Sequence, residues 1–287
     1  MRLTRRSALF ALPAAALAAP EPAGLARRIG LTTGSFMPHL SESAAAGKLV
    51  MLDLPAIMRD DLGLTVLDLM TACLPSLDRA YCDKLRNNAV KAGITITNLK
   101  MNQPKLDMAS PDPETRRHAL SVYESTIDSA AVLGCRWVRP IPGPNRPDLK
   151  LLAGSYHRLM DYGARRGIAL LVENYGWMTG DPDAIPAVVK AVGRGLRCQP
   201  DTGNWEDAVR YQGLEKAFPL AVSCDFKAFD MGADGSHARY DLKRCFDAGW
   251  KAGFRGPWCF EHFHKELKPL LREMVVLRDL LRKWMSA

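Results

Sequence analysis

The sequence predicts an α/β fold, a single (β/α)8 TIM barrel, from three observations. Short and nearly continuous apolar segments alternate with helical patterns along the chain, as in parallel strands covered by helices. Eight such units occur in about 260 residues, the length that an eight-stranded barrel needs. The glycines of 30–34 have the wrong spacing for Gly-x-Gly-x-x-Gly, so a dinucleotide-binding fold loses its main support.

The elements are expected in a regular order. Strands are predicted at residues 28–33, 64–70, 94–99, 137–140, 168–173, 196–201, 220–227 and 257–261. Helices are predicted at residues 79–92, 112–133, 148–166, 183–192, 242–252 and 266–284. The helix over 112–133 has the clearest ends, because Pro113 suits a first turn and Gly134 a helix stop. No low-complexity linker interrupts residues 24–287, so we assign them to one domain.

The first 23 residues are expected to form an export signal. Arg2, Arg5 and Arg6 precede an uncharged apolar stretch over 8–19, which has the order of a secretory signal and is too short to span a membrane. The run over 4–10 resembles a twin-arginine signal. The chain of 287 residues carries a formal charge of +8, of which cleavage would remove three arginines. We therefore expect a periplasmic or secreted protein with no stable membrane association after cleavage.

The seven cysteines include no Cys-x-x-Cys pair. A zinc finger or a thioredoxin-like site is therefore not supported. Several cysteines lie in apolar runs, where cysteine acts as a small buried hydrophobic residue. We expect free thiols, and a disulfide between Cys73 and Cys82 stays open.

Acidic residues stand at the ends of the last four predicted strands: Glu173, Asp201, Asp225 and Glu261. The carboxyl ends of barrel strands meet on one rim, where barrel enzymes have their active sites. Four carboxylates held together repel one another unless a cation neutralises them or some are protonated. Oxygen-rich sites suit hard divalent ions, so the sequence predicts Mn2+ or Mg2+ here. Solvated loop carboxylates that cap the following helices are the alternative.

These segments resemble the sugar phosphate isomerase/epimerase family, the xylose isomerase-like TIM barrels. The resemblance rests on residues 171–174, 199–204, 222–227 and 260–262, in the second half of the chain. It implies that Glu173, Asp201 and Glu261 take metal-ligand and acid/base positions. The histidine ligand of the family is replaced here by Asp225, and a frequent histidine after the strand-six aspartate is replaced by Asn204.

The implied chemistry is removal of a proton next to a carbonyl, through an enediolate. Glu173 and Glu261 are predicted to act as base and acid on the two faces of a keto-sugar, and a metal would spread the developing charge. Lys227 is predicted to hold a substrate oxygen or that charge. Elimination of a β-hydroxyl from the same intermediate, a lyase or dehydratase reaction on a keto-sugar or cyclitol, stays open.

The expected partner is a small carbohydrate. Substrate contacts are predicted for a set of residues near the strand ends, each with a structural role as the alternative: Arg139, Trp177, Asn204, Trp205, His237 and His262. A nuclease of the apurinic-endonuclease type needs several histidines beside the carboxylates, whereas none of the six present ends predicted strands five to seven. Nucleic acid is therefore not expected. A non-catalytic carbohydrate-binding barrel and a homodimer are alternatives that the sequence leaves open.

Overall fold

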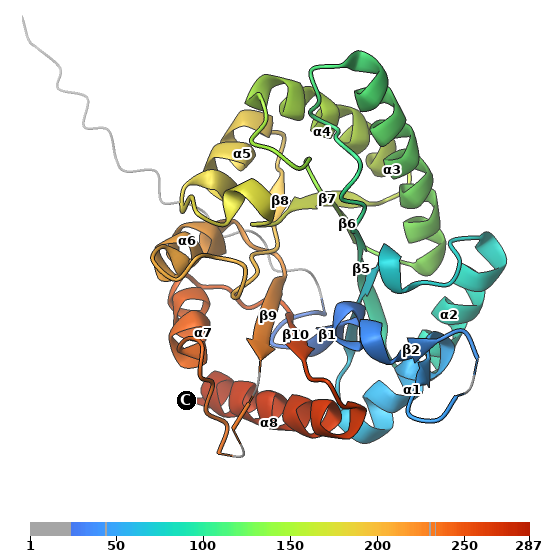
Figure 1. The fold of residues 1–287 in the computed structure, drawn as a ribbon, viewed down its shortest axis with the longest axis vertical. Coiled ribbons are helices and arrows are strands. Elements are labelled where there is room, and N and C mark those ends of the chain that lie inside the picture. Colours follow the sequence, from blue (N-terminus) through green and yellow to red (C-terminus); the bar gives the residue numbers. More distant parts are fainter. Residues whose placement is uncertain (1–23, 44, 230, 233) are drawn as a thin grey trace, which may run out of the picture.

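The computed structural model describes residues 24–43, 45–229, 231–232 and 234–287. The predicted export signal over 1–23 lies outside them. Figure 1 shows a ring of helices around a central ring of strands, and the first strand lies beside the last. The predicted α/β TIM barrel is confirmed.

Eight parallel strands form the main sheet. They are β1 (Ile29–Thr32), β4 (Val66–Met70), β5 (Thr95–Met101), β6 (Trp137–Pro140), β7 (Ala169–Val172), β8 (Arg197–Cys198), β9 (Cys224–Phe229) and β10 (Trp258–Phe263). Their order in the sheet is β8-β7-β6-β5-β4-β1-β10-β9. The short strands β2 (Leu40–Ser41) and β3 (Leu49–Val50) pair separately.

Two isolated parallel bridges join the segments that contain the edge strands β8 and β9. One pairs Cys198 with Ala221 and the other pairs Asp201 with Asp225. Backbone hydrogen bonds support the second bridge, with Asp225 donating to the carbonyl of Pro200 and Thr202 donating to the carbonyl of Asp225. This seam closes the barrel next to two of the acidic residues that the sequence singled out.

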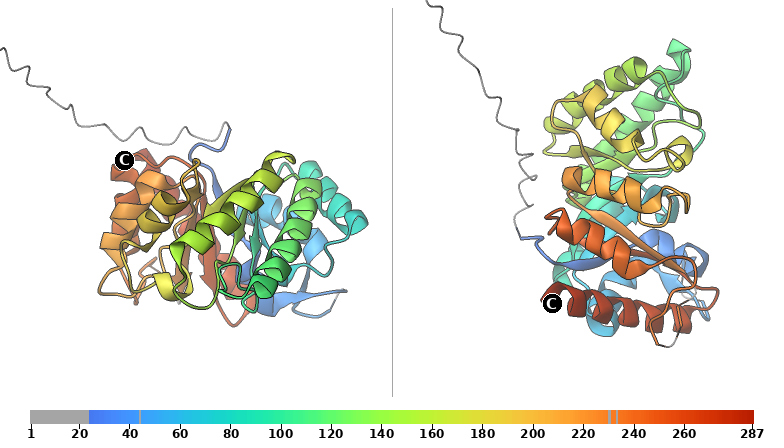
Figure 2. Two further views of the ribbon diagram at one scale, coloured as in Figure 1. Left: turned by 90° about the horizontal axis from the view of Figure 1, so that it is seen from above. Right: turned by 90° about the vertical axis from the view of Figure 1, so that its left-hand side faces the viewer.

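The helices cover the outside of the sheet (Figure 2). They are α1 (Leu54–Ile57), α2 (Arg79–Lys91), α3 (Pro113–Leu133), α4 (Leu149–Ala164), α5 (Ala184–Val192), α6 (Arg210–Ala217), α7 (Leu242–Lys251) and α8 (Leu267–Ser286). The carboxylate of Asp112 accepts from the backbone of Glu114 and Thr115 at the start of α3, and Gly134 ends the helix with φ of +79°. The helices α1 and α6 are additions to the predicted set.

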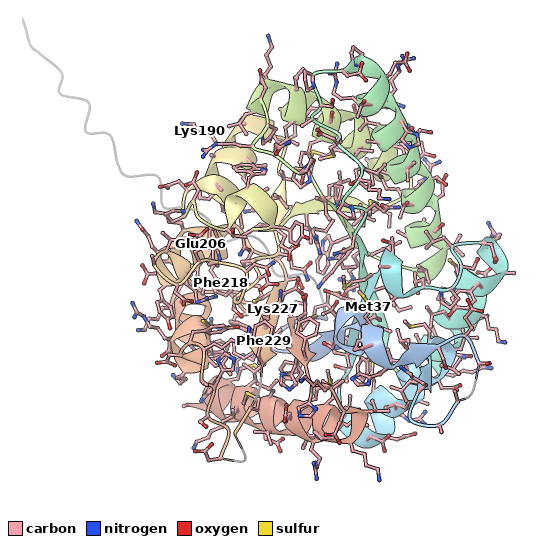
Figure 3. The ribbon with its side chains drawn as sticks, viewed as in Figure 1. Met37, Lys190, Glu206, Phe218, Lys227 and Phe229 are labelled. Atoms are coloured by element: carbon pink, nitrogen blue, oxygen red, sulfur yellow. The ribbon has the colours of Figure 1, made fainter. Side chains whose placement is uncertain are left out.

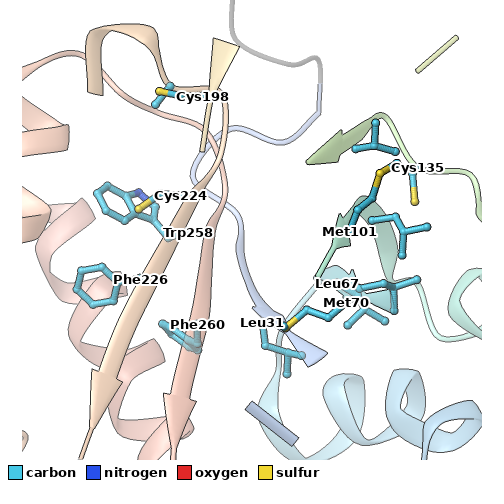
Figure 4. Close-up of a cluster of buried hydrophobic side chains, with 14 of the residues drawn as sticks. Leu31, Leu67, Met70, Met101, Cys135, Cys198, Cys224, Phe226, Trp258 and Phe260 are labelled. Atoms are coloured by element: carbon cyan, nitrogen blue, oxygen red, sulfur yellow. The ribbon is translucent and has the colours of Figure 1, made fainter. Parts of the chain in front are cut away.

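The core lies between the strands and the helices. Figure 4 shows part of it, including Leu31, Leu67, Phe226, Trp258 and Phe260 on the strands. All seven cysteines are buried and free, in agreement with the expectation of free thiols. Within the described ranges, no helix combines the length and the apolar character that a membrane crossing requires.

Strand register places charged residues at matching levels near the carboxyl ends of the strands. Lys100 of β5 is level with Arg139 of β6. Glu261 of β10 is level with Lys227 of β9. Since side chains alternate between the two faces of a strand, these residues share the interior face at one end of the barrel.

Candidate functional site

The four predicted carboxylates converge at this end of the barrel. Glu173 follows β7, Asp201 follows β8, Asp225 lies on β9 and Glu261 on β10. One oxygen from each of Glu173, Asp201 and Asp225 lies within 4.8 Å of the others, and all three residues are buried. We call the set of Glu173, Asp201, Asp225 and Glu261 the carboxylate cluster.

Two cations from neighbouring strands meet the cluster from one side. Arg139 Nη1 lies 2.5 Å from Glu173 Oε2, and Lys100 Nζ lies 2.5 Å from Asp225 Oδ1. The Lys100 ammonium also lies 3.7 Å from Glu261 Oε2. Both cationic side chains are almost completely buried. Arg139, predicted as a substrate contact, thus pairs with a carboxylate of the cluster.

The third cation is Lys227, which is labelled in Figure 3 and contacts two carboxylates of the cluster. Its Nζ lies 2.8 Å from Asp201 Oδ2 and 3.0 Å from Glu261 Oε1. It also donates to Asn204 Oδ1 over 2.6 Å, while Asn204 Nδ2 donates to Glu173 Oε1 over 3.1 Å. The amide of Asn204 therefore links the Lys227 ammonium to the carboxylate of Glu173.

Asp201 is held by the turn that follows it. The backbone amides of Gly203 and Asn204 donate to Asp201 Oδ1 over 2.7 and 3.0 Å. Asn174 adds a hydrogen bond from its side chain to the carbonyl of Asp201. Because one carboxylate oxygen is fixed by the backbone, the other faces the cluster.

The three cations do not fully balance the four carboxylates. Burial raises the pKa of Glu173, and Asp201 adds to the shift against the opposing effect of Arg139. Burial likewise raises the pKa of Asp201 and of Asp225, and Lys227 and Lys100 oppose these shifts only in part. The excess negative charge favours retention of a proton within the cluster.

Glu261 differs from the other three carboxylates. Burial would raise its pKa, but Lys227 and Lys100, on two sides of the carboxylate, outweigh that effect and hold the pKa below its usual value. Glu173 and Glu261 therefore have pKa values that are shifted in opposite directions.

A layer of buried polar residues lies beneath the cluster, and sequence reasoning did not find it. Gln199 Nε2 lies within hydrogen-bond distance of Asp68 Oδ2 at 2.6 Å and of Asp225 Oδ1 at 3.2 Å. Gln199 Oε1 accepts from Asn98 Nδ2 over 2.6 Å. Lys100 was also missed, although a charged residue directly after the predicted strand 94–99 is the same kind of signal that marked Glu173.

Some predicted substrate contacts lie away from the cluster. His262 follows Glu261, so its side chain lies on the other face of β10, and its Nε2 is 2.5 Å from Glu273 Oε2 of α8. The geometry gives no support to its predicted substrate contact. Trp205 is 1% exposed in the hydrophobic core, so it is placed for packing instead.

Two further predicted contacts lie at the periphery. The ring of His237 bonds the backbone amide of Phe229 and contacts the carbonyl of Tyr240. These bonds fix its loop against β9. Trp177 is partly buried beneath the guanidinium of Arg146, 5.2 Å from the ring centroid. Neither residue has a described contact with the cluster, and their roles stay predictions.

The donors of the cluster suit a hard divalent cation. Among the described residues, the fully buried Asp225 Oδ2 has no hydrogen-bond partner, and Glu173 Oε2 and Asp201 Oδ2 have ion-pair contacts without a hydrogen bond. Carboxylate oxygens that converge in this way provide the ligand set that Mg2+ and Mn2+ prefer. The cluster could therefore hold a metal ion.

A cavity of about 440 Å³ opens beside the cluster. Asn204, which bonds Glu173 and Lys227, forms part of its wall. Tyr175, Ile141 and Pro144 line it with apolar surface. Asn204 is thus the residue that the cavity wall shares with the hydrogen-bond network of the cluster.

Comparisons with known proteins agree with this geometry. A family model described as xylose isomerase-like TIM barrel matches residues 60–283. A D-psicose 3-epimerase from Clostridium cellulolyticum H10, solved with D-tagatose, is 15% identical, with a TM-score of 0.70 over 89% of this chain and 98% of that one. An L-ribulose 3-epimerase is 15% identical, with a TM-score of 0.69 over 90% and 94%.

A third similar structure contains a metal. It is a xylose isomerase-like TIM barrel protein from Mycobacterium smegmatis in complex with magnesium, 18% identical, with a TM-score of 0.63 over 90% of this chain and 97% of that one. Comparison with curated proteins gives no significant match. At these identities the structures establish a shared fold.

Proposed function

The chain belongs to the xylose isomerase-like TIM barrel family, and from this premise we propose that it is a divalent-metal-dependent keto-sugar isomerase or epimerase. The observation that carries the proposal is the pairing of buried carboxylates with buried cations at the catalytic end of the barrel. Proton abstraction next to a carbonyl needs a base, an acid and positive charge for the enediolate. The cluster and its cations supply all three.

The opposite pKa shifts assign the acid and the base. Glu261, whose pKa is lowered by Lys227 and Lys100, is ionised and removes the proton. Glu173, whose pKa is raised by burial, is the proposed acid and would deliver a proton on the other side of the substrate. In the reverse reaction the two groups exchange roles.

Lys227 stabilises the charge that develops during this proton transfer. Its ammonium lies between Asp201 and Glu261, where a substrate oxygen that replaces one carboxylate contact would meet a cation. A positive charge next to that oxygen would stabilise the enediolate.

Glu173, Asp201 and Asp225, together with Glu261, are the residues that would hold the ion, and Mn2+ or Mg2+ suits their oxygen donors. When bound, the ion would polarise the carbonyl and spread the charge of the enediolate. The magnesium in the similar Mycobacterium smegmatis protein supports this assignment.

The substrate is expected to be an unphosphorylated keto-sugar, because we also propose that residues 1–23 direct the protein out of the cytoplasm by the twin-arginine route. Fusion of these residues to a reporter tests the export. Replacing Arg5 and Arg6 by lysine should abolish it, and unchanged export would contradict the assignment.

Deuterium exchange tests the function. The purified protein is incubated in D2O with Mn2+ and a panel of free ketoses, keto-glycosides and cyclitol ketones, and products are followed by NMR and mass spectrometry. We expect deuterium at the carbon next to the carbonyl, together with the epimer or isomer. Loss of water from the product would instead identify a lyase, and sugar binding without exchange would identify a binding protein.

A further inference from the structure

The Lys227 ammonium is coordinated much as a small cation would be. It has three oxygen neighbours within 3.0 Å, which are Asp201 Oδ2, Glu261 Oε1 and Asn204 Oδ1. An ammonium has three N–H donors, so its oxygen neighbours equal its donors in number. Two of these acceptors belong to the carboxylate cluster, and Asp201 is also one of the three convergent metal-ligand candidates.

The surrounding chain fixes Lys227 in this position. Its backbone amide donates to Thr202 Oγ1 over 3.0 Å, and its carbonyl accepts from the hydroxyl of Tyr240 over 2.8 Å. Gly203 leaves room for the side chain, because a Cβ at that position would lie 2.6 Å from Lys227 Cδ. The backbone on both sides of the seam is thus arranged around this one side chain.

We propose that Lys227 is a resident cation that competes with the divalent ion for the carboxylate cluster. A metal ion on Asp201 would be a close neighbour of the ammonium and would be repelled by it. Metal binding therefore requires the ammonium to move away from Asp201 and Glu261, and the metal is held weakly and exchanges readily. The inference rests on the proposed function only in its use of the cluster as the metal site.

Metal affinity tests this competition directly. Mn2+ is titrated into metal-free protein and bound ion is measured by electron paramagnetic resonance and calorimetry, for the wild type and for Lys227→Gln. We expect Lys227→Gln to bind Mn2+ about tenfold or more tightly, because an unscreened like charge has been removed. Affinity that is unchanged or lower in Lys227→Gln overturns the proposal.

Two matched variants serve as controls. One keeps the charge of Lys227 and changes its shape, and the other lowers the net charge of the protein at a distant site. Lys227→Arg keeps the positive charge and should retain the weak affinity of the wild type. Lys216→Gln removes a lysine whose partner is Asp183, on the outside of the barrel, and should bind as the wild type does. If Lys227→Arg binds Mn2+ as tightly as Lys227→Gln, charge competition is wrong.

A second measurement uses the wild type and does not depend on the folding of a variant. Lysine acetylation is mapped by mass spectrometry with and without Mg2+. The proposal requires Lys227 to become more reactive when Mg2+ enters, since its ammonium leaves the carboxylates. Unchanged or reduced labelling contradicts it. Neither measurement uses turnover, so failure of the deuterium exchange experiment would count against the proposed function alone.

Discussion

The two sides of the barrel rim bring opposite charges to the site. The strands β5 and β6 supply Lys100 and Arg139, whereas the acidic residues lie on or directly after β7 to β10. Lys227 on β9 is the one member of the cation set that comes from the acidic side. Charges this deeply buried are tolerated only when paired, so the basic side is as necessary to the site as the acidic side.

The largest expected effect is on turnover, and it comes from the acidic side. Glu173→Gln and Glu261→Gln should each lower kcat by about 1,000-fold or more, because each removes a proton-transfer group. Rates are measured with the substrate found by deuterium exchange, and circular dichroism checks the fold. Glu124→Gln, the same change at a residue of α3 that pairs with Arg158, serves as the control. Retained turnover in either site variant would contradict the acid and base assignment.

The largest expected effect on stability comes from the basic side. Lys100→Met leaves the buried Asp225 carboxylate without its partner at 2.5 Å, which should cost about 3–5 kcal/mol of unfolding free energy. Urea denaturation near neutral pH measures it. Adding Asp225→Asn to Lys100→Met should restore part of the loss. A cost below about 1 kcal/mol would show that the pair is dispensable.

The excess negative charge of the carboxylate cluster should make the free energy of unfolding depend on pH. Because the folded-state pKa of Asp225 is raised, the folded protein keeps a proton that the unfolded chain loses above about pH 4, so stability falls as pH rises through that window. Asp225→Asn should make this fall shallower, by at most about 1.4 kcal/mol per pH unit. Denaturation in chelator at a series of pH values measures both slopes. Equal slopes would mean that Asp225 does not titrate in this window.

The smallest expected effect is at a surface pair. Lys216 contacts Asp183 at 2.7 Å, but both side chains are substantially solvated. Lys216→Ala should change the unfolding free energy by no more than about 0.5 kcal/mol. Urea denaturation alongside Lys100→Met gives the contrast between an exposed and a buried lysine. If Lys216→Ala lowered the unfolding free energy as much as Lys100→Met does, the predicted difference between an exposed and a buried ion pair would be wrong.

Much of the fold could be predicted because its strands are buried on both faces. The predicted strands 137–140 and 168–173 match β6 and β7 closely, since short, mostly apolar segments bounded by Gly or Pro leave few alternatives. The helix α6 was missed because its segment mixes charged and apolar residues without a clear helical period. The predicted strand 196–201 is shorter in the structure, where β8 ends at Cys198.

The acidic side of the site was predictable, whereas on the basic side only Arg139 was singled out from the sequence. Carboxylates at successive strand ends are visible in the sequence, and the structure brings them together. The partners Lys100 and Gln199 depend on register across the barrel, because they contact Asp225 from residues 125 and 26 positions away. The outward direction of His262 follows from strand alternation once Glu261 is placed inside.

The seam between β8 and β9 has a consequence for the whole molecule. The bridge between Asp201 and Asp225 lies at the joint where the two ends of the strand order meet, and both residues belong to the cluster. A ligand that binds both side chains would link the two strand segments across that joint. Because such a ligand binds only the closed barrel, its binding free energy stabilises the closed state. Occupancy of the site should therefore slow amide hydrogen exchange along the seam as well as at the rim.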